Sequence, residues 1–171
     1  MLFRSPYTLA PGAYTAVVSG KNNTSGVALV EVYDLDQSSG KLGNISTRAF
    51  GSTGDNIVIA GVVLREGPEL DRIVLRGIGP SLAPGSLPVS AVLANPTLEL
   101  RDQDGTLVSA NNDWQDDSAR AAELIAAGLA PANDLESAIT VTLPPGSYTV
   151  LLAGLNGGTG IGLVEIYDRG P

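Results

Sequence analysis

Short stretches in which apolar and polar residues alternate recur along most of this chain of 171 residues. Such alternation is typical of a β-strand with one face buried and the other in water. Turns rich in Gly, Pro, Asn and Asp separate the stretches, as expected between strands. The pattern predicts about ten strands, at 13–19, 27–34, 45–50, 57–64, 72–77, 97–101, 106–110, 137–143, 147–153 and 161–168.

One stretch has helical spacing instead. Ala121, Leu124 and Ile125 fall on one side of a helix, acidic residues precede them, and Gly128 follows where a helix can end. We therefore predict one short helix near 116–127. Because helices do not alternate with the strands, the chain is expected to be all-β, an antiparallel β-sandwich of the jelly-roll type.

Three pairs of neighbouring strands are joined by short turns, which predicts β-hairpins at 13–34, 97–110 and 147–168. The strand at 57–64 is apolar at nearly every position. A strand of that kind is expected to be covered on both faces.

The chain contains one sequence twice. Residues 9–36 and 143–170 align without a gap at an offset of 134, and 13 of the 28 aligned positions are identical. Repetition at a fixed spacing indicates an array of copied units. We predict that 1–36 contains the C-terminal hairpin of a preceding repeat and that 37–171 is one complete repeat.

The expected partners are therefore neighbouring repeats of the same polypeptide. A hairpin without its own sandwich has open edges, so the N-terminal one is expected either to pack on the complete repeat or to cause self-association by strand exchange.

The first residues differ in character from the rest. Leu-Phe-Arg-Ser at 2–5 is also what a common sequencing-adapter end encodes, so we expect residues 1–5 to be non-native, with chance occurrence as the alternative. The start MLFRSP lacks the apolar core of a signal peptide. No stretch of the sequence is long and apolar enough to span a bilayer, and membrane insertion is not expected.

Composition narrows the function classes. The net charge of −8 repels a phosphate backbone, so nucleic acid is not an expected partner. The chain has no Cys and no His, which excludes disulfides, thiolate nucleophiles, Cys/His zinc sites and a Ser-His-Asp triad within it. The Gly-rich stretch at 77–83 lacks the third Gly of a dinucleotide fingerprint and the Lys of a Walker A loop. We expect a protein that is not an enzyme.

Acidic and amide side chains concentrate between 102 and 117, and Ca²⁺ prefers such oxygen ligands. The turn at 102–105 and the loop at 111–117 lie at opposite ends of one predicted strand, so one site cannot use both. The predicted calcium ligands are Asn111, Asp113, Asp116 and Asp117, and no other cofactor is expected. The alternative is structural, with an Asx-turn at 102–105 and a helix cap at 116–118.

Trp114 is the single tryptophan and lies in the same loop. It is a candidate ligand contact, since aromatic rings commonly line carbohydrate sites. The alternative is a plug that anchors the loop to the core.

Residues 95–168 carry a resemblance to a known group. NPTLELRDQDGTLVSANNDW, then LESAITVTLPPGSYTVLLAG and GIGLVEIYD, resemble the bacterial pre-peptidase C-terminal domain. NISTRAF, GDNIVIAG and RGIGPSLA resemble phrases of uncharacterised repeats in large surface proteins of environmental bacteria. The chain departs from the simpler family by its helix and by the added strands within 44–78.

The resemblance implies a β-sandwich, an extracellular or cell-surface location, and an accessory role such as adhesion, matrix binding or spacing. The expected function is a non-enzymatic structural or adhesive repeat module. The alternative is an accessory module that binds carbohydrate or matrix protein and is stabilised by calcium.

Overall fold

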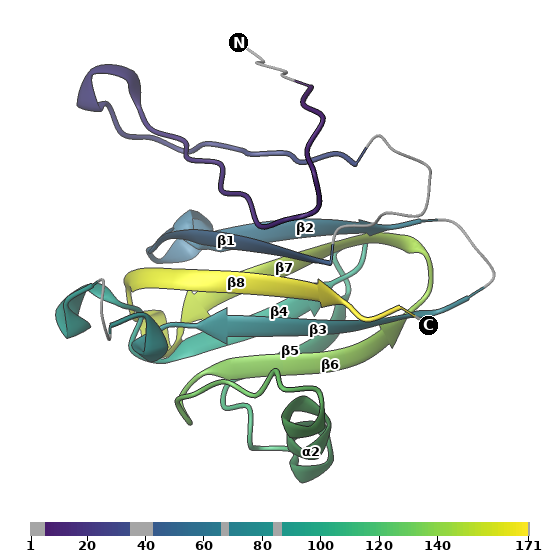
Figure 1. Ribbon diagram of the computed structural model, residues 1–171. Coiled ribbons are helices and arrows are strands. Elements are labelled where there is room, and N and C mark those ends of the chain that lie inside the picture. The colour runs from purple at the N-terminus through teal and green to yellow at the C-terminus, as the bar shows by residue number, and fades with distance from the viewer. Residues whose placement is uncertain (1–5, 35–42, 66–68, 84–86, 171) are drawn as a thin grey trace. The chain divides into compact units, whose positions relative to one another are not determined.

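The computed structural model describes residues 6–34, 43–65, 69–83 and 87–170 (Figure 1). The chain divides into two compact units, Met1–Gly40 and Lys41–Pro171. Within the described part of the first unit, the backbone doubles back at a short 3₁₀ turn, η1 (Lys21–Asn23). Residues 1–5, which we expect to be non-native, lie outside the described residues. The origin of 1–36 in a preceding repeat stays a prediction.

The described residues of the second unit form eight strands and one α-helix. In chain order these are β1 (Asn44–Gly51), β2 (Val58–Leu64), β3 (Asp71–Ile78), β4 (Pro96–Arg101), β5 (Leu107–Asn111), α2 (Ser118–Ala126), β6 (Ser137–Leu143), β7 (Gly146–Gly154) and β8 (Gly160–Asp168). Each strand ends within one residue of its predicted bounds. Single 3₁₀ turns lie between them, namely η2 (Gly54–Asn56), η3 (Pro80–Leu82), η4 (Val89–Ala91) and η5 (Leu155–Gly157).

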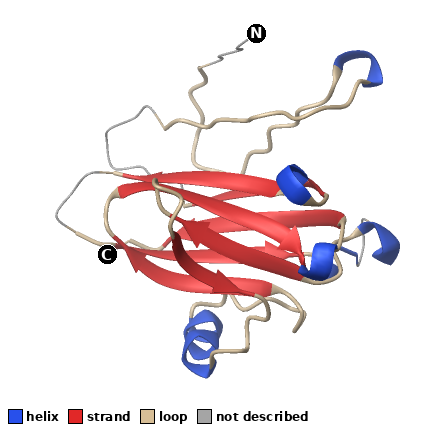
Figure 2. Ribbon diagram, turned by 180° about the vertical axis from the view of Figure 1, so that it is seen from behind, coloured by secondary structure: helices blue, strands red, loops and turns tan. Residues whose placement is uncertain are grey.

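The strands form two four-stranded sheets packed face to face (Figure 2). Sheet A has the order β1-β8-β3-β6 and sheet B the order β2-β7-β4-β5, and the ladders between these strands are antiparallel. The first strand therefore lies beside the eighth, the second beside the seventh, the third beside the sixth and the fourth beside the fifth. This is the strand order of a jelly roll, and the predicted fold class is confirmed.

The main core lies between the two sheets, because alternate residues of each strand point inward. Ile73 and Leu75 of sheet A, and Val150 and Leu152 of sheet B, are completely buried. Burying an aliphatic side chain of this size stabilises the fold by about 1.5–3 kcal/mol. Val, Leu and Ile thus supply the core in a chain that is only 5% aromatic.

A second, smaller cluster lies on the outer face of sheet A. Helix α2 buries Ala121 and Leu124 there, against outward-facing residues of β3 and β6. The helix begins where predicted, because the carboxylate of Asp117 accepts hydrogen bonds from the backbone N–H groups of Ala119 and Arg120. It ends before Gly128, whose φ of 68° suits glycine.

Two of the three predicted hairpins are wrong. The pair β4–β5 is a hairpin, as predicted. By contrast, β7 pairs with β2 and β4 in sheet B, whereas β8 pairs with β1 and β3 in sheet A. The segment 146–168 is thus a β-arch, in which two consecutive strands join opposite sheets. Alternation and a tight turn look the same in a hairpin and in an arch, since neither reveals which strand supplies the hydrogen bonds.

The N-terminal copy forms no strand ladder within its described residues, 6–34. The two segments of an arch do not hydrogen-bond to each other, so this copy does not form a ladder by itself. Its two predicted strands, at 13–19 and 27–34, are therefore missing, and the described residues have eight strands instead of about ten.

The prediction for 57–64 is also wrong in one respect. Strand β2 belongs to one layer of a two-layer sandwich, so only its inner face reaches the core between the sheets. On its outer face, Ile59 is 55% and Val63 is 74% exposed.

Candidate functional site

The loop between β5 and α2 is held in place by Asn111 at its start. The Asn111 side-chain amide donates to the backbone oxygen of Asp113 at 3.0 Å, and its Oδ1 accepts from the Ala138 N–H at 2.9 Å. These bonds tie the loop to β6 in the opposite sheet. Asn111 therefore already uses in the fold the side-chain oxygen that a cation would need.

Asp113 and its neighbour have spare acceptor oxygens. Asp113 Oδ2 accepts from the Asn112 amide at 3.2 Å, whereas Asp113 Oδ1 and Asn112 Oδ1 are buried and have no hydrogen-bond donor. Buried acceptors are normally satisfied, so two together in one loop are unusual. Among the residues that the structure describes, no group of three or more Asp, Glu, His or Cys side chains is arranged to hold a metal.

Three of the four predicted calcium ligands border one hollow of about 540 Å³ over β4 and β5. Its lining consists of Thr97, Leu98, Glu99, Ala110, Asn111, Asn112, Asp116, Asp117 and Arg120. Asp113 is not among them, and the carboxylate of Asp117 caps α2. Asn111, Asp116 and Asp117 therefore border one hollow, whereas Asp113 is hydrogen-bonded to the loop around it but does not line the hollow.

The turn at 102–105 has the structure that the non-metal alternative describes. Asp102 Oδ1 accepts from the N–H groups of Asp104 at 2.9 Å and Thr106 at 2.8 Å. This is an Asx-turn, closed by Gly105 at a φ of 79°. The carboxylate of Asp102 thus has a structural role in this turn.

Calcium binding remains a prediction for the loop 111–117. If it occurs, millimolar Ca²⁺ should raise the melting temperature, since a ligand that binds only the folded state stabilises it. Asp116→Asn should remove that increase. Asp104→Asn, at the other end of β5, is the matched control and should leave it intact. Melting curves that coincide with and without Ca²⁺ would contradict the prediction.

Trp114 is buried, with 7% of its surface exposed. It packs in the cluster beneath α2, and its backbone N–H donates to the backbone carbonyl oxygen of Glu136 at 2.9 Å. The ring thus anchors the loop, and a direct contact with a ligand would require it to leave this cluster.

Glu136 is a functional candidate that we did not predict from the sequence, and it has no exposed surface. Its Oε1 accepts from the N–H groups of Gly79 at 3.0 Å and Ser81 at 2.9 Å. Its Oε2 accepts from the Ser81 hydroxyl at 2.8 Å and from the Asn133 N–H at 3.4 Å. The Gly-rich loop after β3 therefore binds an anion, but the anion is a side chain of the same protein. No local pattern marks Glu136, because Gly79 and Ser81 are 57 and 55 positions away in sequence.

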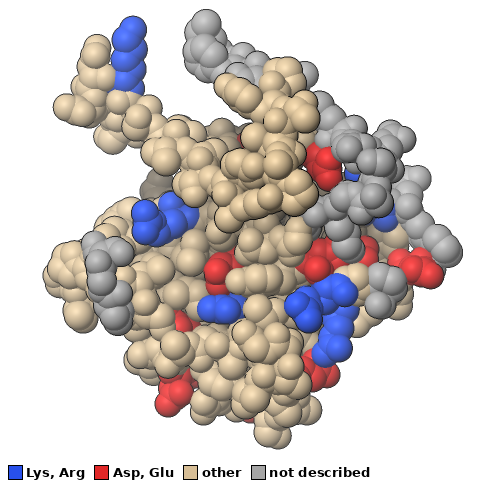
Figure 3. All heavy atoms as spheres, in the orientation of Figure 1, with Lys and Arg blue, Asp and Glu red and all other residues tan. Residues whose placement is uncertain are grey.

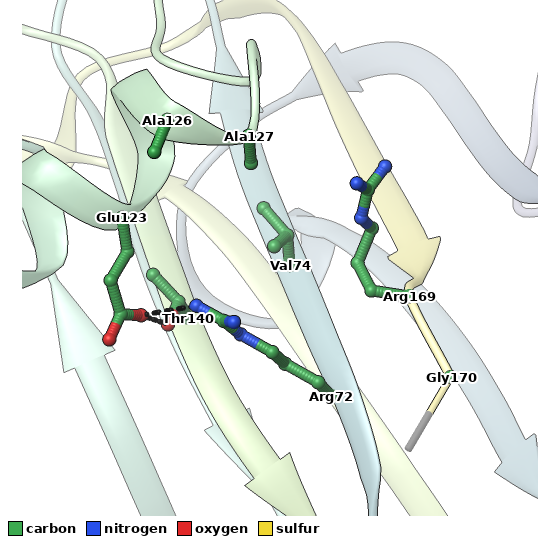
Figure 4. Close-up of a pocket in the computed structure, with 8 residues that line it drawn as sticks. All are labelled: Arg72, Val74, Glu123, Ala126, Ala127, Thr140, Arg169 and Gly170. Carbon is green, nitrogen blue, oxygen red and sulfur yellow. Dashed lines mark hydrogen bonds and ion pairs between the residues drawn. The ribbon is translucent and has the colours of Figure 1, made fainter.

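A second hollow, of about 420 Å³, lies between α2 and sheet A (Figure 4). Arg72 extends from β3 toward Glu123 of α2, and the two form an ion pair of 2.9 Å. The Thr140 hydroxyl donates to the same carboxylate oxygen of Glu123 at 2.5 Å. Arg169 lies on the other side of the hollow. The ion pair fastens the helix to the sheet.

The hydrogen bond from Thr140, followed by that from Arg72, lowers the pKa of Glu123 below its ordinary value of 4.5. Because the carboxyl pKa is lowered, these contacts contribute their full stabilisation at a pH above the ordinary pKa. That stabilisation is lost as the pH falls through the lowered pKa. We expect an NMR titration to place the pKa of Glu123 below 4.5, and Thr140→Val to raise it. An unchanged pKa in that variant would contradict the assignment. The effect on stability should be small, since about half of each charged side chain is exposed.

Charges of both signs are interspersed on the face shown in Figure 3. The net charge of −8 is therefore not gathered into one acidic patch on that face. Among the described residues, no helix has the length and apolar character needed to cross a membrane.

No protein-family model matches the sequence, and no curated protein matches it. Among solved structures, the fold is similar to the pre-peptidase C-terminal domain of a collagenase from Bacillus anthracis. The identity is 11%, the TM-score is 0.42, and the match covers 74% of this chain and 89% of that one. A likeness of this size carries no information about ligands or activity.

Proposed function

We propose that this chain is a non-enzymatic structural module, repeated within a larger secreted or cell-surface bacterial protein, where it acts as a spacer or an adhesive unit. The observation that supports this most directly is that the two sequence copies repeat their local structure as well as their residues. Location outside the cell is supported by the sequence resemblance of residues 95–168.

The two copies make the same turn. Asn22 and Asn156 occupy equivalent positions and have φ angles of 58° and 54°. The same bond closes both turns, from Thr24 N–H to the Lys21 oxygen and from Gly158 N–H to the Leu155 oxygen. Positive φ in a residue other than Gly is uncommon, so its recurrence marks a copied structure.

The copies also repeat two tyrosine contacts. The hydroxyl of Tyr14 donates to the Ala10 oxygen at 2.8 Å, and that of Tyr148 to the Pro144 oxygen at 2.9 Å. Farther along, Tyr33 donates to Glu31 at 3.0 Å and Tyr167 to Glu165 at 3.2 Å. Whole supersecondary units copied along a chain are what a modular array consists of.

The spacer role can be tested by small-angle scattering of tandem chains that contain one, two and four periods of 37–170. A spacer should lengthen in proportion to the number of units while its cross-section stays constant. Chains that collapse into a compact particle would contradict it. Adhesion is tested separately, by retention of the same chains on surfaces coated with matrix proteins.

The hollow beside the loop 111–117 supports the second candidate, an accessory module that binds carbohydrate or matrix protein. If it binds, a glycan and matrix-protein array should show signals that Asp116→Ala and Glu99→Ala abolish. Asp104→Ala, outside the hollow, should leave them unchanged. A blank array with the folded wild-type chain would argue against this candidate.

A further inference from the structure

We propose that residues 9–34 are a donor arch, which completes the sandwich of a second copy of this unit by lying where β7 and β8 lie in the sandwich described above. This rests on the proposed function, in which units of one kind follow one another. It goes beyond it by naming the contact, its register and the residues that make it.

The two copies have apolar residues at the same inner-face positions, but these residues are buried in β7 and β8 and exposed in 9–34. In β7 and β8, the inward-facing Tyr148, Leu152, Val164 and Ile166 are at most 8% exposed. Their equivalents Tyr14, Val18, Val30 and Val32 are between 51% and 60% exposed. Exposure of that size on four apolar side chains indicates a face from which a partner is missing.

A sandwich shell made of strands like β1 to β6 supplies what this face lacks. Strand β8 lies between β1 and β3, and β7 lies between β2 and β4. Each strand of the arch therefore takes hydrogen bonds on both edges from the shell and none from its companion. Residues 6–34 form no strand ladder of their own.

Gly26 points to the same partner. Its equivalent, Gly160, must be glycine because a Cβ there would lie 2.6 Å from the backbone of Val92 and Leu93. A Cβ on Gly26 would meet nothing within 4 Å. Gly26 therefore has no steric reason to be glycine in its own surroundings, but has one in the place that Gly160 occupies.

A paired change between the copies fits the same packing. A Cβ on Gly162 would lie 2.7 Å from a methyl carbon of Leu152. The donor arch has Ala28 at the position of Gly162, and the shorter Val18 at that of Leu152. One side chain gains a methyl group where the facing one loses a methylene group, as expected if 9–34 closes a core in the same way.

Charge on the outer face is also matched. Glu165 of β8 forms an ion pair of 3.1 Å with Arg76 of β3. Glu31 is its equivalent in the donor arch. In the place of β8 it would meet the same arginine of the second copy.

The test uses the full chain with its own arch disabled. Val164→Asp puts a carboxylate at a position with no exposed surface, so β8 can no longer fill its place. If 9–34 substitutes for it in a second copy, this variant stays folded by circular dichroism, melts below the wild type and elutes as a dimer or larger. Adding Val30→Asp should unfold it, whereas Val30→Asp alone should change nothing.

The register of the donor arch against β1 can be measured with introduced cysteines, since the chain has no cysteine of its own. Ser46 lies opposite Glu165 across the β1–β8 ladder, so Ser46→Cys with Glu165→Cys shows whether a disulfide can form there. In the Val164→Asp background, Ser46→Cys with Glu31→Cys should give a disulfide between molecules. Val30→Cys in place of Glu31→Cys faces the other way, and its yield should be about tenfold lower.

Equal unfolding of Val164→Asp with and without Val30→Asp would overturn the proposal, as would a folded monomer or equal yields from the two cysteine positions. Rod-like scattering of the tandem chains together with any of these results would leave the spacer function standing. A tandem chain that collapses, together with the predicted disulfide, would contradict the spacer function and leave the donor arch standing.

Discussion

Replacing Glu136 by alanine should lower the free energy of unfolding by about 3–5 kcal/mol, because it leaves the buried N–H of Gly79 and three partly buried donors without an acceptor. The backbone N–H group of Gly79 cannot turn toward water, since Gly79 is held against the Leu93 backbone, where a Cβ would lie 2.0 Å from the carbonyl oxygen. The loop after β3 and the start of β6 should loosen together.

Glu136→Gln separates charge from shape in the same site. Its amide keeps one oxygen, which can still accept from Gly79 and Ser81, but its NH₂ group faces the donor of Asn133. We expect a loss of about 1–2 kcal/mol, clearly smaller than that for alanine. Urea unfolding gives both values, and hydrogen exchange at Gly79 and Ser81 locates the change. Equal losses for the two variants would show that the packing and the hydrogen bonds that glutamine keeps contribute little, and that the second carboxylate oxygen carries the effect.

The second large effect is expected from Gly160→Ala, which should cost about 3–5 kcal/mol. The new methyl group would lie 2.6 Å from the backbone of Val92 and Leu93, at a φ of 155°. Backbone atoms cannot rotate away as a side chain can, so β8 or the turn η4 must shift.

Gly26→Ala is the matched control, because it makes the same change at the equivalent position of the other copy. It should alter stability by no more than about 0.5 kcal/mol in the full chain, since nothing lies near that position. In the Val164→Asp background, the same change should prevent strand exchange. Thermal melting of the two single variants side by side checks the prediction. A Gly160→Ala protein as stable as the wild type would mean that the approach of β8 to η4 is loose.

Local sequence was sufficient to locate the strands and the helix of the sandwich unit. Period-two alternation marked residues such as Ile139 and Val164, and Asp117 with Gly128 marked the ends of α2. Both signals come from residues that are a few positions apart, so they can be recognised without knowledge of the fold. The jelly-roll class followed from the number of strands and the near absence of helices.

The candidate site was predictable only in part. Asn111, Asp116 and Asp117 do border one hollow, because they are close in sequence and share one loop. Trp114 packs in the cluster beneath the helix that follows it, in line with the alternative that it anchors the loop to the core. Glu136 escaped because its hydrogen-bond donors come from a loop on another strand.

Local alternation was enough to locate the eight strands of the sandwich and most of their inward-facing residues, and alignment of the chain with itself showed one unit written twice. How the strands pair became known from the fold. It turned the repeated hairpin into an arch between two sheets, with each strand hydrogen-bonded to a different pair of neighbours. This difference arises because alternation reflects the burial of each side chain, whereas strand pairing satisfies backbone groups that are alike in every residue. Which strands pair therefore depends on segments that are distant in sequence.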